Sequence, residues 1–291
     1  ALVLATVFWL ATWALLSAYR AGWLPPALLG SGLVVLLIFD LTATGAYMDI
    51  SERDPTSGFD HPAILDFLRS DPELFRIDSD TGIADRWQPD TAALYGLQDI
   101  AGIANPLTLR SVQSYLESTG GRDSTRYDLL NVKYVLVGEG VPLPEGAFER
   151  VFGPAHGLEL HRNLTYAPRA WYAPADANLE DIELPPEPLA AHTTQFAAGS
   201  LDATIAAPAP GYLVIAEMFY PGWQATVDGI PTAILPVNET LMAVPVPAGA
   251  AAVSLRFWPA SFTWGLLAAG IALLALILLF FIPRRSTRRG S

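Results

Sequence analysis

The stretch FTWGLLAAGIALLALILLFFI, residues 262–282, decides the architecture of the chain, because it runs for 21 residues without a charge. An α-helix rises about 1.5 Å per residue, so this segment is long enough to cross a hydrocarbon layer of roughly 30 Å. We therefore predict a transmembrane helix over residues 259–283. The whole chain is 52% hydrophobic and only 16% charged, a composition typical of membrane proteins.

Two further apolar blocks lie at the start of the sequence. Residues 1–19 carry no charge, and residues 27–44 carry a single acid, Asp40, near the end of the block. We predict two transmembrane helices within residues 1–46, which gives a membrane α-helical part with three spans. The alternative is a cleaved signal peptide followed by one anchor. It is disfavoured because no basic leader precedes the first block and a second block follows at once.

The basic residues predict the orientation of these helices. Residues 284–291 contain four arginines and no acid, and segments rich in arginine and lysine stay on the cytoplasmic side of a membrane. We therefore expect a cytoplasmic basic tail and an extracytoplasmic segment over residues 47–258, in a multi-pass membrane protein. Because the chain starts inside an apolar run and without methionine, we expect it to be the C-terminal part of a longer protein.

The outer segment is strongly acidic and has no cysteine. It contains 12 basic and 28 acidic residues, a net charge of −16, and such a field repels nucleic acid. The same field repels anionic lipid head groups, so neither these nor nucleic acid is an expected partner, although solubility alone also explains the acidity. The lipid bilayer is the expected partner because of the apolar spans. The absence of cysteine from the sequence excludes disulfides, thiolate metal sites and thiol nucleophiles, so a packed core must stabilise this segment.

The outer segment divides at a proline-rich, acidic stretch, residues 177–190, which we predict to be a linker. Residues 47–176 mix helical spacing with short apolar strands, which predicts an extracytoplasmic α/β or α+β region. Its clearest strand is the apolar run Lys133–Val137, of the type that is buried on both faces. Residues 191–258 contain several short strand-like segments separated by turn residues, which predicts a C-terminal antiparallel β-sandwich.

Two acidic features are candidate sites. Asp40 is a candidate intramembrane acid, and an acid within a span is a functional candidate by default; the alternative places it at the water interface. Residues 49–61 crowd several carboxylates beside a histidine, which is suitable chemistry for a divalent cation, but a solvated loop is the favoured explanation. We predict no metal site, because the stretch lacks calcium-loop spacing and the histidines lack paired zinc spacing.

The most distinctive segment is MFYPGWQATVDGIPTAILPVNETLMAVPVPAG, residues 218–249. Tyr220 and Trp223 flank a Pro-Gly turn, and paired aromatic rings beside a polar turn can stack on sugar rings. Asp228 and Asn238 would supply hydrogen bonds, so we predict a glycan-binding site of these four residues. The alternative is that Trp223 packs inside the sandwich and Tyr220 caps it, and the frequent role of aromatic rings in cores favours this.

This segment also carries a resemblance to a known family. The run YPGW, then VDG, Asn238 and AVPVPAG before a strand and a terminal membrane helix, resembles the C-terminal end of the bacterial YfhO-like family of large multi-spanning membrane proteins. Earlier pieces of the sequence are similar to the family as well. They are FDL (39–41), ALYGLQDIAGI (93–103), DLLNVKYVLV (128–137) and APRAW (167–171).

Members of that family look like glycosyltransferases of the multi-spanning C type, which move a sugar from a polyprenyl-phosphate carrier to an acceptor outside the cytoplasm. The resemblance implies that this chain is the C-terminal, non-catalytic portion of such an enzyme, in the bacterial cell membrane. It also implies a polyprenyl-phosphate sugar as the donor, and a cell-envelope glycan or lipid-linked sugar as a partner.

We predict no catalytic residue in this chain. The family's catalytic acid lies in a first outer loop near the N-terminus, and no residue here corresponds to it. The sequence also contains no nucleophile elbow, phosphate-binding glycine loop or triad order, and no cofactor is evident in this segment. The alternative function is a membrane-tethered extracytoplasmic carbohydrate-binding or scaffold module without catalysis.

Overall fold

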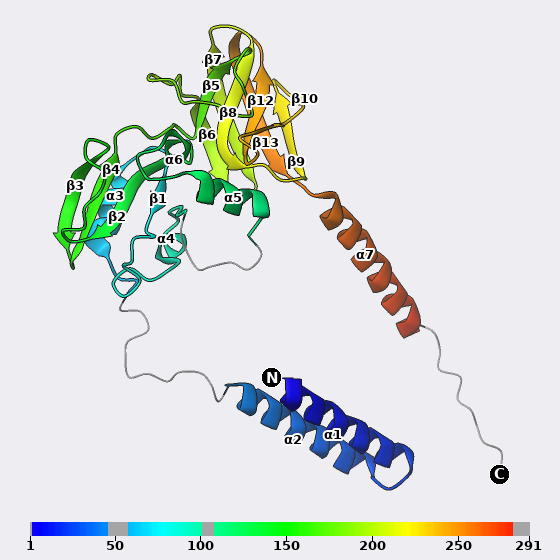
Figure 1. Cartoon of the computed structure of the whole chain (residues 1–291). Helices are drawn as coiled ribbons and strands as arrows, with labels where there is room; N and C mark the ends of the chain where they lie inside the picture. Colours follow the sequence, from blue (N-terminus) through cyan, green and yellow to red (C-terminus); the bar gives the residue numbers. More distant parts are fainter. Residues whose placement is uncertain (1, 46–57, 101–107, 282–291) are drawn as a thin grey trace. The chain divides into compact units, whose positions relative to one another are not determined.

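The computed structural model describes residues 2–45, 58–100 and 108–281 (Figure 1). The chain divides into two compact units, residues 1–57 and 58–291. The first unit is a helical hairpin of α1 (Leu2–Arg20) and α2 (Pro26–Gly45). The two helices are in contact, and the rings of Phe8 and Phe39 pack with centroids 5.8 Å apart.

By length and composition, one helix among the described residues is able to cross a membrane. It is α7 (Ala260–Phe281), through its apolar part Ala260–Ile277. The apolar part of α2, Pro26–Thr42, is shorter than a span requires. Of the three predicted spans, the structure therefore supports the C-terminal one, and the two N-terminal spans stay predictions.

The second unit begins with an α/β part, residues 58–166, built on a four-stranded sheet in the order β1-β2-β4-β3. Strands β1 and β2 are parallel, and the other pairs are antiparallel. The strands are β1 (Arg76–Asp78), β2 (Val132–Gly138), β3 (Phe148–Ala155) and β4 (Leu158–Asn163). The helices are α3 (Pro62–Ser70), α4 (Thr91–Leu94), α5 (Arg110–Ser118) and α6 (Thr125–Asp128).

Strand β2 is the centre of the α/β part. All seven of its residues are buried, which confirms the apolar strand predicted at Lys133–Val137. Successive side chains of a strand point to opposite faces, so β2 contributes to two cores. Leu136 packs in the core that contains α3, whereas Val135 packs in a second core beside Tyr115 of α5.

The rest of the second unit contains two antiparallel sheets packed face to face, in the orders β11-β12-β8-β5 and β10-β9-β13-β7-β6. Their strands are β5 (Ala170–Pro174), β6 (His192–Ala197), β7 (Ser200–Ala207), β8 (Gly211–Met218), β9 (Trp223–Val227), β10 (Ile230–Thr232), β11 (Leu235–Val237), β12 (Leu241–Val246) and β13 (Gly249–Phe257). Alternate apolar residues of both sheets form one core, in which Leu213 and Met242 of one sheet meet Leu201 and Leu255 of the other. The predicted antiparallel, sheet-rich C-terminal region is therefore present.

The sandwich also uses chain that lies before the range 191–258 predicted for it. Strand β5 joins the first sheet by pairing with β8, about forty residues further along the chain. The stretch predicted as a linker, residues 177–190, packs on the outer face of that sheet. Ile182 is buried there, and its backbone N–H donates a hydrogen bond to Asn238 Oδ1 at 2.8 Å. The pairing of β5 and the packing of residues 177–190 cannot be recognised from the local sequence, because both depend on partners that are distant in sequence.

Strand β13 leads directly into α7, and the junction between them is packed. The Trp258 backbone N–H donates to the Gly222 carbonyl at 2.8 Å. Gly222 has φ +120°, and a Cβ at this position would lie 2.9 Å from Pro259 Cα. Only glycine tolerates both that backbone conformation and so close a neighbour. Gly222 therefore allows the turn before β9 to lie directly against the start of α7.

We expect Gly222→Ala to lower the free energy of unfolding of the sandwich by about 3 kcal/mol, because it adds a steric clash to backbone strain. Gly229→Ala is the matched control. Gly229 also has positive φ, but nothing lies within 4 Å of its added Cβ, so the loss should be about 1 kcal/mol. Urea unfolding of the full chain in lipid nanodiscs, followed by tryptophan fluorescence, measures both. Equal losses would contradict a packed junction.

Candidate functional site

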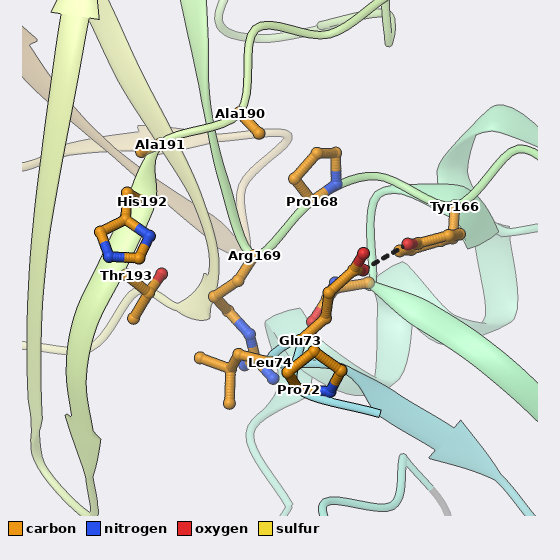
Figure 2. A pocket seen from close by; sticks show the side chains of 11 residues that line it. Pro72, Glu73, Leu74, Tyr166, Pro168, Arg169, Ala190, Ala191, His192 and Thr193 are labelled. Carbon is orange, nitrogen blue, oxygen red and sulfur yellow. Dashed lines mark hydrogen bonds between the residues drawn. The ribbon is translucent and has the colours of Figure 1, made fainter. Parts of the chain in front are cut away.

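A cleft of about 400 Å³ lies between the α/β part and the sandwich, and we call it the Arg169 cleft. It is lined by residues 72–74 and Asn131 of the α/β part, by Tyr166, Pro168 and Arg169 of the connecting chain, and by residues 190–193 at the start of β6. Figure 2 shows Arg169 reaching from the sandwich side toward Leu74 and Pro72, with Glu73 and Tyr166 on the other side. The cleft therefore draws residues from four separate stretches of the sequence.

The guanidinium of Arg169 is almost completely buried at one wall of this cleft, with 1% of the side chain exposed. Its Nη2 donates to Gln98 Oε1 at 2.7 Å, and its Nη1 lies 3.4 Å from Glu217 Oε2. Arg76 of β1 uses the same carboxylate oxygen at 3.2 Å. Two guanidinium groups thus share one carboxylate, and this wall has an excess of positive charge.

The electrostatic cost of that arrangement appears in the pKa of Arg169. Burial, and then the neighbouring Arg76, lower this pKa to about 9, whereas Glu217 raises it. Arg169 remains charged at neutral pH, because its pKa is still above 7. A buried cation of this kind is most stable beside additional hydrogen-bond acceptors or negative charge.

The opposite wall carries an excess of negative charge. Lys133 forms ion pairs with Asp71 and, at 2.9 Å, with Glu73 Oε2. The Tyr166 hydroxyl donates to the same Glu73 oxygen at 2.6 Å. Burial and this hydrogen bond raise the pKa of Tyr166, so the phenol keeps its proton at neutral pH. The cleft therefore has one positive and one negative wall and no large net charge.

Two buried polar atoms beside the cleft have no hydrogen-bond partner within the described residues. They are Arg169 Nε, which is a donor, and Asn131 Oδ1, which is an acceptor. Leaving such an atom unsatisfied costs about 1–3 kcal/mol. The other end of the Asn131 amide is satisfied, because Nδ2 donates to the Ala167 carbonyl at 2.9 Å. Both atoms are closed off from solvent, so they belong to the packed wall behind the cleft and not to its accessible surface.

The structure brings two of the four residues of the predicted glycan site together. The rings of Tyr220 and Trp223 both pack against Phe257, with centroids 6.0 and 5.4 Å from it. Trp223 contacts the sandwich core, and Tyr220 is 44% exposed. Asp228 follows the opposite end of β9, where its Oδ1 accepts from the Ala252 backbone N–H at 2.9 Å. Asp228 therefore belongs to the turn after β9 and does not lie beside the aromatic pair.

Asn238 is separated from the aromatic pair because it follows β11 in the other sheet. Its side chain is buried and its Oδ1 is used by Ile182, while its Nδ2 is without a hydrogen bond among the described residues. It lines a recess of about 160 Å³ with Tyr115 and Arg126. Burial raises the pKa of Tyr115 to about 12, against the opposing effect of Asn238.

Asp40 lies in α2 of the first unit, where it is half-buried. Most of the acidic stretch 49–61 lies outside the described residues. Within the described ranges there is no group of three or more histidine, aspartate and glutamate side chains that could hold a metal ion.

The sequence reasoning did not single out Arg169 or Asn131 as site residues. Both lie in segments quoted for the family resemblance, APRAW and DLLNVKYVLV. The available signal was an arginine two residues before a buried tryptophan, in a short run that is otherwise apolar. Nothing in that spacing shows that Glu217, almost fifty residues later, is the partner.

Comparison with known proteins gives one match. Residues 189–269 match the family model for the bacterial membrane protein YfhO, which covers β6 to β13 and the first half of α7. No curated protein and no solved structure matches the chain. The resemblance predicted for the C-terminal region is confirmed, and the match together with α7 supports membrane association.

We expect Glu217→Gln to lower the free energy of unfolding by about 3 kcal/mol, because it leaves two buried guanidinium groups without their carboxylate. Asp202→Asn is the control, since the Asp202–Arg256 pair lies at the surface and its loss should cost at most about 1 kcal/mol. Urea unfolding in nanodiscs compares the two variants. A loss for Glu217→Gln no larger than for the control would show that the shared carboxylate does not join the two parts.

A second expectation concerns acid stability. Burial raises the pKa of Asp71, but hydrogen bonds from Lys133 and Tyr134 outweigh it and hold this pKa below its ordinary value of 3.8. The group therefore adds stability above pH 3.8 that is lost as the pH falls below it. Asp71→Asn should flatten the decline of unfolding free energy between about pH 5 and 3. Glu149→Gln, which removes an exposed ion pair with Arg162, should leave the decline nearly unchanged.

Proposed function

Because residues 189–269 form a YfhO-like region that ends in an apolar helix, we propose that the chain is the C-terminal, non-catalytic part of an integral membrane glycosyltransferase. In this proposal a sugar moves from a polyprenyl-phosphate carrier to an acceptor on the extracytoplasmic side. The described residues from 58 to 258 lie on that side and receive the acceptor.

Exposed apolar side chains of the first unit support the proposal of a multi-pass protein. Trp9 is 73% exposed, Trp13 62% and Val35 64% within the helical hairpin. Large apolar side chains without protein cover are suited to lipid contact. In this proposal both helices of the hairpin and α7 span the membrane, and the four arginines after α7 support a cytoplasmic tail.

The Arg169 cleft is the part of the outer region that we propose to bind the acceptor, as a glycan. The single observation that carries this is the cleft itself, which Glu73, Tyr166 and His192 line with polar groups. Sugar hydroxyls can donate to the exposed carboxylate of Glu73, and the two oppositely charged walls supply further donors and acceptors. The cavity of about 400 Å³ lies within the range of small-molecule sites, which is about 300–1,000 Å³.

Two variants test the cleft with little risk to the fold. His192 is exposed at its rim, and Glu73 has 57% of its side chain exposed. In nanodiscs, titration calorimetry with oligosaccharides from bacterial cell envelopes should give an affinity that falls about fivefold for His192→Ala and for Glu73→Gln, since each removes about one hydrogen bond. His156→Ala, at the exposed turn between β3 and β4, should bind as the parent chain does.

Tyr220→Ala shows whether a glycan binds in the Arg169 cleft or at the site predicted by the sequence. Binding that survives Tyr220→Ala but weakens with the two cleft variants supports the cleft. Binding lost with Tyr220→Ala alone would move the glycan to the aromatic turn. No binding to any glycan would contradict acceptor recognition and favour a membrane-tethered scaffold. The sequence upstream of residue 1 tests the enzyme class, because further spans and an acid in a first outer loop are required.

A further inference from the structure

The turn of Tyr220, Pro221 and Gly222, which joins β8 to β9, lies where the sandwich meets α7, and we call it the aromatic turn. The Gly222 carbonyl accepts from the Trp258 backbone N–H at 2.8 Å, and the Gly222 backbone touches Pro259. The ring of Tyr220 is 6.0 Å from that of Phe257, three residues before α7 begins. The turn therefore lies at the level of the first residues of the membrane helix.

The aromatic side chains at this level are exposed. Tyr220 is 44% exposed, Trp258 50% and Trp264 71%. Trp258 packs edge-on to Phe262 at 4.9 Å and donates its indole N–H to Thr263 Oγ1 at 2.9 Å. Tyrosine and tryptophan concentrate at membrane interfaces, where the ring contacts lipid and the polar tip contacts water.

The length of α7 fixes the depth of this group. Its 22 residues extend for about 33 Å, slightly more than a hydrocarbon core of roughly 30 Å. The residues just before Ala260 therefore reach the head-group layer, which is about 5–7 Å thick on each side. Tyr220 is held at that level by its contact with Phe257 and by the junction at Gly222.

The α7-bearing sheet carries little charge at this end, although the other sheet has the exposed Glu239 beside Thr240, whose carbonyl accepts from the Phe219 backbone N–H. The turn residues 197–200, whose Gly199 carbonyl accepts from the Phe257 backbone N–H, carry no charge, and neither do residues 218–223. Arg256 is neutralised by two hydrogen bonds to the carboxylate of Asp202. In a chain of net charge −12, this end of the α7-bearing sheet offers no unpaired charge that would resist contact with lipid.

We propose that the aromatic turn is a lipid-contact surface, in which the ring of Tyr220 lies in the head-group layer beside α7. The occupant of this surface is the interface of the bilayer, and not a sugar ring as the sequence alone suggested. The contact holds one end of the sandwich against the membrane. It requires that α7 crosses the bilayer, but it is independent of any glycosyltransferase activity or of the Arg169 cleft.

The absence of cysteine from the sequence makes a direct test possible. Tyr220→Cys and Ile230→Cys, each in the full chain, carry a nitroxide spin label in vesicles of phosphatidylcholine with a minor fraction of phosphatidylglycerol. Ile230 is the matched control, because it is 68% exposed and begins β10, at the opposite end of the hairpin. Power-saturation spectroscopy compares collisions with oxygen, which dissolves in lipid, and with a water-soluble nickel chelate.

We expect the label at position 220 to collide several-fold less often with the nickel chelate, and more often with oxygen, than the label at position 230. Pro221→Cys repeats the measurement with Tyr220 in place, so that loss of the ring itself cannot explain the result. Labels at 220 and 221 that meet the chelate as often as the label at 230 would overturn the proposal. Shielding that appears only after a glycan is added would overturn it as well, because the occupant would then be sugar.

Discussion

The sharing of one carboxylate by two guanidinium groups is the interaction on which the second unit depends. Arg76 lies in the α/β part, Arg169 lies just before β5, and Glu217 lies in β8 of the sandwich. Taking such charges out of water is expensive, and the cost is recovered only when they stay close and fully hydrogen-bonded. A relative shift of the two parts would expose or separate these charges. The positions of the α/β part and the sandwich are therefore set by electrostatics as well as by packing.

Strand β8 transmits this constraint toward the membrane. Its residue Glu217 belongs to the junction with the α/β part, and Tyr220 of the aromatic turn follows only three residues later. An extended chain covers about 3.3 Å per residue, so Glu217 and Tyr220 are at most about 10 Å apart along the chain. Gly222 then packs on Pro259 at the start of α7. A ligand in the Arg169 cleft would thus be held at a set distance from the bilayer, as an acceptor for lipid-linked chemistry requires.

The sequence was sufficient for the features that depend on local pattern. The uncharged run 262–282 predicts α7, the apolar run Lys133–Val137 predicts β2, and strand-like segments with Asp-Gly turns predict an antiparallel sheet region. Each of these signals arises from the period of a single element and the solvent around it. The hydrophobic period of an element is recognisable within a few residues. The element can therefore be predicted without knowing which other element packs against it.

The sequence was not sufficient for the features that depend on distant partners. Strand β5 joins the sandwich through β8, and Arg169 is recognisable as a junction residue only once Gln98 and Glu217 are beside it. A lone arginine has no periodicity, and its burial contradicts its ordinary preference for the surface. For the same reason, a pattern search that looks for clusters of acids, histidines or aromatic rings passes over the cleft.

The aromatic turn shows a different limit, in which the residues were found but the partner was not. A tyrosine and a tryptophan beside a Pro-Gly turn have the same chemistry whether they face a sugar ring or a lipid head group, because both surfaces present apolar C–H groups beside hydroxyls and other polar atoms. The choice depends on what lies next to the turn in space. Gly222 against Pro259 places the start of the apolar helix α7 there, and this position makes lipid contact available to Tyr220 when α7 crosses a bilayer.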